Sequence, residues 1–158
     1  VFFLPGGKVV GYTGILKYAK NDDQLATVIS HEVAHALARH GAERVTQGMI
    51  QQGVGLIGSV AVAATAPQYQ NAFNQAYGLG SNLGVMLPYG RMQESEADEI
   101  GIYLMHKAGY NVNEATKFWE NMSEGKSGGN DFFSTHPSSQ NRTKDIQTVI
   151  NKIGNESK

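Results

Sequence analysis

The stretch Ile29–His40, ISHEVAHALARH, is the part of the chain around which the rest is organised. Successive residues of an α-helix turn by about 100°, so His31 and His35 project from one face, one turn apart, as two imidazole ligands of one zinc ion require. Glu32 lies beside them and can take a proton from a metal-bound water without being a ligand itself. The HExxH pattern therefore predicts a zinc site with Glu32 as the general base, and the alternative is a solvated, charged helix face.

The sequence before this motif indicates a helix with one buried side. Asn21 is a candidate N-cap, and Gln24 stands three residues later, so the two can form a capping box. Apolar residues then recur at helical spacing: Leu25, Val28, Ile29, Val33 and Leu37. We expect one long helix from about Asp22 to about Arg44.

Length and composition are those of one globular domain. A chain of 158 residues with 41% hydrophobic side chains has enough apolar surface for a single core, so we expect one domain over residues 1–158. The net charge is −1 and no long basic run is present, which gives no indication of a nucleic-acid partner. Cysteine is absent, which excludes disulfide bonds and thiolate metal ligands but leaves the cellular compartment open.

The first residues, VFFLPGGKVVGYTGIL, contain two runs of β-forming residues around Pro5–Gly7 and predict a β-hairpin that leads into a turn at Thr13. Two interpretations stay open: an ordinary edge hairpin, or an exposed edge that pairs with an extended substrate backbone. The chain begins inside this motif and lacks an initiator methionine. We therefore expect a fragment of a longer precursor, in which any signal peptide or anchor would lie upstream.

The segment from Val45 to Gly90 contains no Asp, Glu, Lys or Arg and is rich in Gly, Ala, Gln and Asn. Its apolar part, GVGLIGSVAVAATA, is about fourteen residues long, short of the roughly 20 that a membrane span needs. We expect a close-packed helix that ends near Pro67, because proline cannot continue a helix. The alternative is a hairpin that faces a membrane or a partner.

Two apparent nucleotide-binding motifs fail in their context. Gly53, Gly55 and Gly58 match GxGxxG, but no predicted strand precedes them and no acidic residue follows about 20 positions later. The segment GKSGGN at 125–130 resembles the end of a phosphate-binding loop, but Glu120 stands where the first glycine of that motif belongs. We expect a flexible loop there.

Three further helices are predicted toward the C-terminus. ESEADEIGIYLMHKAG carries an apolar stripe and ends at Gly109 as a C-cap. Asn111 and Glu114 form a capping box for a helix around Trp119, and STHPSSQNR leads into a last helix through Ile146. The predicted fold class is α+β, predominantly α-helical, with one small antiparallel β-sheet or hairpin.

A catalytic zinc takes three protein ligands and leaves one position for water, so a third ligand is needed. His40 lies five residues past His35 and points about 140° around the helix, and Gly41 stands where the metzincin motif has its third histidine. Glu94 and Asp98 are four residues apart in ESEAD and share a helix face. Glu94 can therefore ligate the metal while Asp98 orients a ligating imidazole. A solvated acidic helix start is the alternative.

Taken together, these motifs resemble the gluzincin metallopeptidases of peptidase family M48. The resemblance covers nearly the whole chain, through LPGGKVVGYTGIL, HEVAHALARHGAER, YGLGS, LPYGRMQESEADEIG and STHPSSQNR. The OMA-type branch and the periplasmic branch of the BepA and LoiP type look most similar, because no segment is long enough for the paired membrane spans of the HtpX and CAAX branches.

The resemblance implies that the HExxH helix and the ExxxD helix pack around one zinc ion per chain. Carried over by position, it gives the metal ligands His31, His35 and Glu94, the base Glu32 and the second-shell residue Asp98. His136 matches a histidine that lies near the metal in some members. It can fill the open coordination position as a plug or donate a hydrogen bond to the oxyanion, and the alternative is a cap of the last helix.

The function implied by the resemblance is that of a zinc-dependent endopeptidase whose catalytic domain is residues 1–158. Its partners would be unfolded or misassembled protein substrates in a bacterial cell envelope, where the protein would be periplasmic or lipid-anchored. Membrane association would come from segments outside this chain. The rival hypothesis is a zinc-containing chaperone or binding module whose open metal position is blocked and whose residues 45–90 hold apolar partners.

Overall fold

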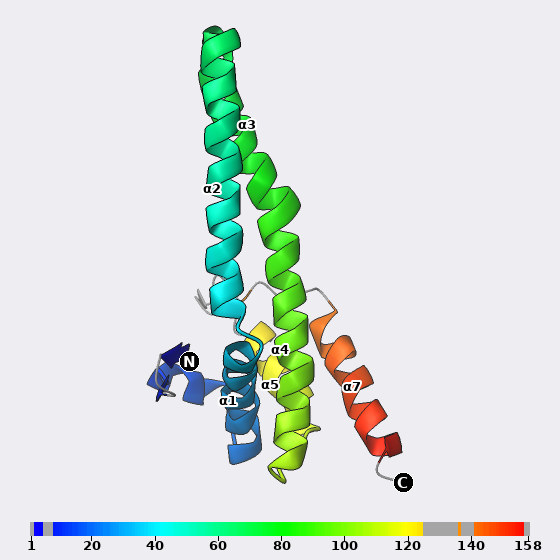
Figure 1. Cartoon of the computed structure of the whole chain (residues 1–158). Coiled ribbons are helices and arrows are strands. Elements are labelled where there is room, and N and C mark those ends of the chain that lie inside the picture. The colour runs from blue at the N-terminus through cyan, green and yellow to red at the C-terminus, as the bar shows by residue number, and fades with distance from the viewer. Residues whose placement is uncertain (1, 5–7, 125–135, 137–140, 157–158) are drawn as a thin grey trace. The chain divides into compact units, whose positions relative to one another are not determined.

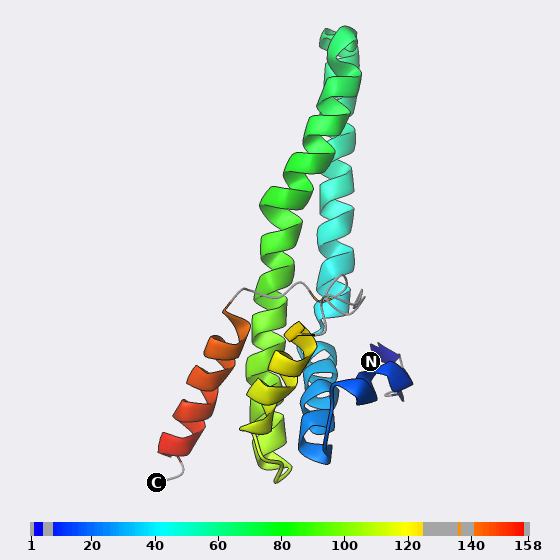
Figure 2. The same ribbon diagram turned by 180° about the vertical axis from the view of Figure 1, so that it is seen from behind.

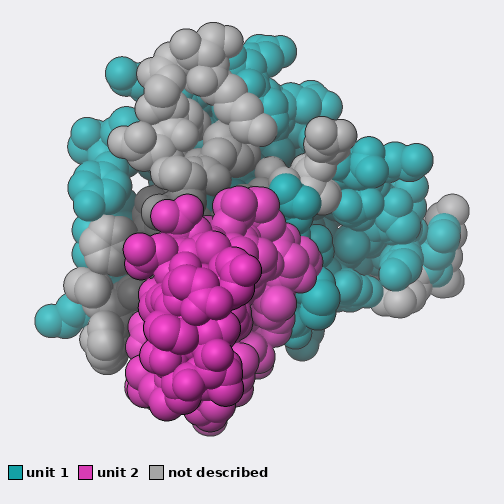
Figure 3. All heavy atoms as spheres, turned by 90° about the horizontal axis from the view of Figure 1, so that it is seen from above, with its two compact units in different colours: residues 1–38, 91–158 teal, residues 39–90 magenta. Residues whose placement is uncertain are grey.

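The structure, a computed structural model, describes residues 2–4, 8–124, 136 and 141–156 (Figure 1). It is predominantly helical, as predicted. The chain forms two compact units, coloured separately in Figure 3. Unit 1 consists of residues 1–38 and 91–158, and unit 2 consists of residues 39–90. The two units are described separately below.

Strands contribute very little to unit 1. The strands β1 (Phe2–Leu4) and β2 (Lys8–Val10) pair antiparallel, with Phe3 opposite Val9. Strands of three residues cannot form a layer, so the small sheet predicted from the sequence amounts to this ribbon within the described residues. The predicted turn at 5–7 lies outside them. The short 3₁₀ helix η1 (Thr13–Lys17) follows where a turn was expected.

Helix α1 (Asp22–Leu37) carries the HExxH motif and begins as the sequence predicts. Its N-cap Asn21 accepts a hydrogen bond from the backbone N–H of Gln24 at 2.8 Å. The side chain of Gln24 accepts from the backbone N–H of Lys20 at 2.9 Å, one residue before the position that a capping box would use. Both bonds satisfy donors at the start of the helix, which fixes where α1 begins.

The expectation of a single helix up to Arg44 is wrong. Helix α1 ends at Leu37, and Arg39 adopts a left-handed conformation with φ 57° and ψ 29°. A left-handed residue cannot continue a right-handed helix, so a new helix, α2, begins at His40. This break is also the boundary between the two units.

Helix α4 (Leu87–Lys107) carries Glu94 and Asp98, and its residues from Arg91 onward belong to unit 1. It ends as predicted, at Gly109 with φ 82°. At Gly101 the helix lies directly against α1, because a Cβ atom there would be 3.2 Å from the backbone nitrogen of His31. A glycine at this position thus lets the two helices that bear the motifs approach closely.

The core of unit 1 is closed by α5 (Glu114–Glu124) and α7 (Arg142–Glu156). Helix α5, yellow in Figure 2, packs against both α1 and α7. The largest buried apolar side chains of this core are Trp119, Phe118, Met105, Met122 and Ile146. The residues of α7 that face the core confirm the predicted last helix.

The predicted capping box of α5 is wrong. The Oδ1 atom of Asn111 accepts from the backbone N–H of Asn113, and the carboxylate of Glu114 turns instead toward the start of α1. It accepts hydrogen bonds from the side-chain amides of Asn21 at 3.0 Å and Gln24 at 2.8 Å. Glu114 therefore joins the N-termini of two helices, a tertiary role that local sequence spacing does not reveal.

Unit 2 is a helical hairpin. Helix α2 (His40–Thr65) is followed by η2 (Pro67–Tyr69), α3 (Gln70–Ser81) and the π-helical turn η3 (Asn82–Met86). Helices α2 and α3 pack against each other. Helix α2 ends two residues before Pro67, close to the predicted position.

The expectation that the apolar segment is close-packed is wrong. Helix α2 has 26 residues, and no residue of its most apolar window is buried. Among the described residues it is the one helix whose length and composition suit a membrane crossing. The sequence estimate was too short because glycines and glutamines interrupt the apolar run, whereas the helix continues through them.

Candidate metal centre

Four side chains of unit 1 converge on one point and form a candidate metal site. His31 and His35 come from α1, Glu94 comes from α4, and His136 lies in the segment before α7. One ligand atom from each lies within 4.8 Å of the others. His31 and Glu94 are each only 1% exposed, so the site is built into the interior of the unit.

The spacing of the ligand atoms fits a tetrahedral metal ion. The two Nε2 atoms of His31 and His35 are 3.1 Å apart, and they lie 3.1 Å and 3.2 Å from the two carboxylate oxygens of Glu94. A tetrahedral zinc with ligand bonds of about 2.0–2.1 Å has ligands roughly 3.3 Å apart. Two imidazoles and one carboxylate are also a common donor set for a catalytic zinc.

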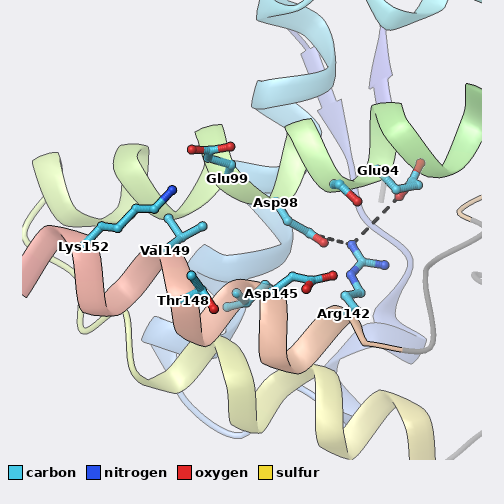
Figure 4. Close-up of a pocket in the computed structure, with 10 residues that line it drawn as sticks. Glu94, Asp98, Glu99, Arg142, Asp145, Thr148, Val149 and Lys152 are labelled. Carbon is cyan, nitrogen blue, oxygen red and sulfur yellow. Dashed lines mark hydrogen bonds and ion pairs between the residues drawn. The ribbon is translucent and has the colours of Figure 1, made fainter.

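Asp98 and Arg142 fix the orientation of His31 at its Nδ1 side, which faces away from the cluster. Its Nδ1 lies 2.9 Å from Oδ1 of Asp98, so Nδ1 carries the hydrogen and the lone pair of Nε2 faces the cluster. Arg142 donates to the same Asp98 oxygen at 2.6 Å, and Figure 4 shows its guanidinium pointing toward Asp98 and Glu94. The guanidinium stacks on the ring of Trp119, 3.3 Å from the centroid.

Sequence reasoning did not find Arg142 and Trp119. Arg142 is 6% exposed and Trp119 is 2% exposed, and both were treated only as parts of helices. The signal available was an arginine directly after STHPSSQN, at the start of an apolar-periodic segment. Only the packing of α5 and α7 on α4 shows that this arginine reaches the carboxylate behind His31.

Glu32 is buried beside the cluster with a carboxylate oxygen that accepts no hydrogen bond from the described residues. It is 4% exposed, and its Oε1 accepts no hydrogen bond from any described residue. The Nε2 atom of His136 is 3.4 Å from that oxygen. Burial raises the pKa of Glu32, and the nearby charges of His136 and His31 offset part of that rise. A carboxylate with a raised pKa and a free oxygen is suited to accept a proton.

The electrostatics of the remaining groups favour a bound cation. Burial would raise the pKa of Glu94, but hydrogen bonds from His136, His31 and His35 hold it well below its ordinary value. Burial lowers the pKa of His35 to about 4, which leaves a neutral imidazole at neutral pH. Burial also lowers the pKa of His31, but Asp98 and Glu94 together raise it above its ordinary value. The pocket around His31 thus attracts positive charge, either a proton or a metal ion.

His136 lies in the cluster, as a residue close to the metal would. Its Nδ1 is 3.2 Å from Oε2 of Glu94, and its ring centroid is 5.5 Å from that of His31. The alternative that His136 only caps the last helix does not match this position. The segment at 125–130 and Pro137 lie outside the described residues.

A cavity of about 240 Å³ opens beside the cluster, lined by residues of α4 and α7 (Figure 4). Glu94 and Asp98 line one side, and Arg142 and Lys152 line the other. His40, the rival third ligand, is not part of the metal-binding group, and neither is Glu96. The structure therefore brings together all six residues that the sequence singled out: His31, Glu32, His35, Glu94, Asp98 and His136.

Comparisons with known proteins show which sequences this chain resembles. The mitochondrial metalloendopeptidase OMA1 of Schizosaccharomyces pombe is 40% identical over 149 residues, which cover 92% of this chain and 42% of that protein. OMA1 of Arabidopsis thaliana is 40% identical over 146 residues, covering 90% of this chain and 28% of that protein. The β-barrel assembly-enhancing protease of Escherichia coli K12 is 29% identical over 154 residues, covering 94% of this chain and 31% of that protein.

The chain spans less than half the length of each of these relatives. The model of peptidase family M48 matches residues 1–150, which include the HExxH helix, Glu94 and His136. By this match the chain belongs to peptidase family M48, a family of metallopeptidases.

Proposed function

We propose that residues 1–158 form the catalytic domain of a zinc-dependent endopeptidase. The observation that carries the proposal is the convergence of two imidazoles and a carboxylate at tetrahedral spacing beside a buried, unpartnered oxygen of Glu32. His31, His35 and Glu94 would hold the zinc. When bound there, zinc supplies a Lewis acid that activates a water molecule and polarises the scissile carbonyl.

Glu32 is the proposed general base and later the general acid. Its free Oε1 accepts a proton from the attacking water, and the same carboxyl group then delivers that proton to the leaving amine nitrogen. The raised pKa of Glu32 suits the role of base, because a more basic carboxylate accepts a proton more readily.

Asp98 and Arg142 are proposed to position His31 rather than to touch the substrate. Asp98 accepts the Nδ1 hydrogen of His31 and so keeps Nε2 available as a ligand. Burial would raise the pKa of Asp98, but Arg142 and His31 keep it lowered, so that it stays a carboxylate. Stacking on Trp119 holds the Arg142 guanidinium in the orientation that this requires.

His136 has two candidate roles, and its position supports the plug. Its imidazole contacts the proposed ligand Glu94 and lies within the cluster, where a plug would have to lie. As a plug, it limits access, and His136→Ala should raise the rate of peptide cleavage. As an oxyanion donor, it contributes to catalysis, and the same substitution should lower the rate by roughly 10²-fold or more. Cleavage kinetics of His136→Ala separate the two roles by sign.

The proposed biological role is quality control of misfolded or misassembled proteins in a bacterial cell envelope. The Escherichia coli relative is named for enhancing β-barrel assembly, and the Schizosaccharomyces pombe relative is named as mitochondrial. Both names, a protease and an endopeptidase, support protein substrates, and only the second names a compartment. The periplasm and a lipid anchor outside this chain are proposals.

A second candidate, a silenced zinc-containing binding module, rests on the position of His136 against Glu94 and Glu32. One experiment tests both candidates: the chain is loaded with zinc and incubated with labelled casein, with and without a chelator, and its metal content is measured in parallel. Chelator-sensitive cleavage with about one zinc per chain supports the peptidase. Stoichiometric zinc without cleavage, in the wild type and in His136→Ala, supports the binding module.

A further inference from the structure

Helix α2 exposes large apolar side chains, whereas a helix in the core of a water-soluble protein buries them. Seven large apolar side chains along its length are between 54% and 73% exposed: Val45, Met49, Ile50, Val54, Leu56, Ile57 and Val60. Toward α3, Gly55 and Gly58 meet the rings of Tyr77 and Phe73, and Gln51 and Ser59 bond to side chains of α3. Water favours the opposite arrangement, because exposed apolar surface is costly.

Glycines determine how closely the two helices of the hairpin approach. A Cβ atom on Gly55 would lie 2.6 Å from the ring of Tyr77, and one on Gly58 would lie 2.5 Å from the ring of Phe73. Neither position accepts a larger residue unless the aromatic ring moves. Small residues at the contact and large apolar residues outside are typical of helix pairs in membranes.

Polar side chains of the hairpin bond to each other inside it. Gln51 of α2 donates to Ser81 of α3, and the hydroxyl of Tyr77 donates to the backbone carbonyl of Gln51 at 2.7 Å. Near the tip, Gln70 donates to Ser59. In lipid, where no water satisfies polar groups, hydrogen bonds between helices are needed and persist.

The uncharged length of the hairpin matches a bilayer. No charged residue occurs from Val45 to Gly90, and charges begin at the open end with Glu43 and Arg44. Tyr89 donates to Glu43 at 2.9 Å, which brings the two ends of the hairpin together. From Val45 to Thr65, α2 has about 20 residues and a length of about 30 Å, the thickness of a hydrocarbon core.

We propose that unit 2 is a lipid-embedded hairpin whose exposed side chains contact the acyl chains of a bilayer. This inference is independent of the proposed peptidase activity, which rests on unit 1. Exposed apolar residues also occur on the other arm of the hairpin, at Leu79, Leu83 and Val85, so apolar surface is present on both helices. A bilayer surrounds such a hairpin, whereas a single protein partner covers one patch with a polar rim.

The exposed polar residues between Val45 and Gly90 are uncharged. Gln52 of α2 and Asn82 of η3 are exposed at a distance from the tip. Asn71, Asn74 and Gln75 are exposed in the first two turns of α3, next to the tip at Pro67–Tyr69. There they would meet lipid headgroups and water. All three are uncharged, so that inserting the tip does not require moving a full charge into hydrocarbon.

The test measures flotation of the whole chain with phosphatidylcholine vesicles, which are neutral overall. Wild-type chain should float with the vesicles and remain bound at high salt, because the segment Val45–Gly90 carries no charged residue that could hold it there electrostatically. Leu56→Lys should weaken vesicle partitioning roughly 100-fold, the usual effect of a charge placed within hydrocarbon. Circular dichroism of each variant confirms that the helices are retained.

Leu16→Lys is the matched control. Leu16 lies in η1 of unit 1, is 55% exposed against 67% for Leu56, and undergoes the same change of charge. Partitioning of Leu16→Lys should stay close to that of the wild type. Equal losses for the two variants, or no flotation of the wild type, would overturn the proposal.

The absence of cysteine permits a second, direct measurement. A polarity-sensitive fluorophore on Leu56→Cys should shift to the blue in vesicles and be quenched by brominated acyl chains, while the same label on Leu16→Cys should respond to neither. Static light scattering without vesicles measures the molar mass in solution and so tests whether a second copy of the chain covers this face instead. A stable dimer that shields the label at position 56 and does not float would contradict the proposal and assign this face to self-association.

Discussion

The two units place their polar and apolar side chains in opposite ways. In unit 1, apolar residues such as Phe118 and Ile146 form the interior, and the polar residues His31 and Glu94 are buried within a network of hydrogen bonds and ion pairs. In unit 2, glycines of α2 meet the rings of Phe73 and Tyr77 of α3, a few polar side chains bond between the helices, and many large apolar residues are exposed. Unit 1 is organised for water around a reactive site, and unit 2 is organised for an apolar surrounding. One chain therefore combines a unit that folds for an aqueous environment with a unit that suits an apolar one.

The largest effect is expected at the buried carboxylate of unit 1. Glu32→Gln preserves the shape of the side chain but removes its ability to accept a proton, so peptide cleavage should fall by about 10²–10⁴-fold. Zinc content should stay at about one per chain, because Glu32 is not among the converging ligands. Turnover and metal analysis of the same preparation check both parts. Near-normal turnover would refute the assignment of Glu32 as base.

The next prediction tests which acidic residue of α4 belongs to the buried site. Glu94→Ala should lose stoichiometric zinc, because one of three ligands disappears, whereas Glu96→Ala should retain it. Glu94 is 1% exposed and faces both histidines, while Glu96 is exposed and lies outside the metal-binding group. Metal analysis after dialysis compares the two. Retention by Glu94→Ala together with loss by Glu96→Ala would reverse the choice of ligand.

The contrast between the units predicts that the same substitution, Ile→Ala, lowers the free energy of unfolding by different amounts in each. Ile146→Ala removes a side chain that is 1% exposed in unit 1 and should lower the free energy of unfolding by about 2–5 kcal/mol. Ile57→Ala removes one that is 73% exposed in unit 2 and should change it by no more than about 0.5 kcal/mol in solution. Chemical denaturation measures both. A large loss of unfolding free energy for Ile57→Ala would mean that this face is packed against protein. The two units would then not differ in where their apolar side chains lie.

The smallest effect is expected at Glu114, the carboxylate that joins α5 to the start of α1 by hydrogen bonds. Hydrogen bonds from Lys117, Asn21 and Gln24 lower the pKa of Glu114 to about 2, against 4.5 for an ordinary glutamate. A lowered pKa in the folded state means that the charged group stabilises the fold above about pH 4.5 and that this contribution is lost as the pH falls toward 2. Glu114→Gln should therefore melt below the wild type at pH 7, with the difference shrinking through that window. A pH-independent difference in Tm would show that the charge is not responsible.

The side chains proposed for the site lie together, as their spacing suggests, whereas the helix that carries His31 and His35 ends at another residue than predicted. Helical spacing placed His31 and His35 on one face of their helix, and it placed Glu94 and Asp98 on one face of a second helix. Such spacing is a property of local geometry. The long helix was predicted past Arg39, where the left-handed conformation ends α1. The capping box at Glu114 also failed, because its carboxylate found donors on another helix. Helix ends depend on competing contacts that a local pattern does not contain.

By itself, the sequence supplied the candidates: the side chains proposed to bind a metal, the one proposed to act as a base, and the segment that carries no charge. These are properties of residue types and of short helical periods, which remain the same in any fold that keeps those helices. Only the tertiary structure decided that Arg142 and Trp119 support Asp98 behind His31, because they come from helices distant in the chain. It also decided which side of α2 faces outward, since that depends on which residues α3 covers.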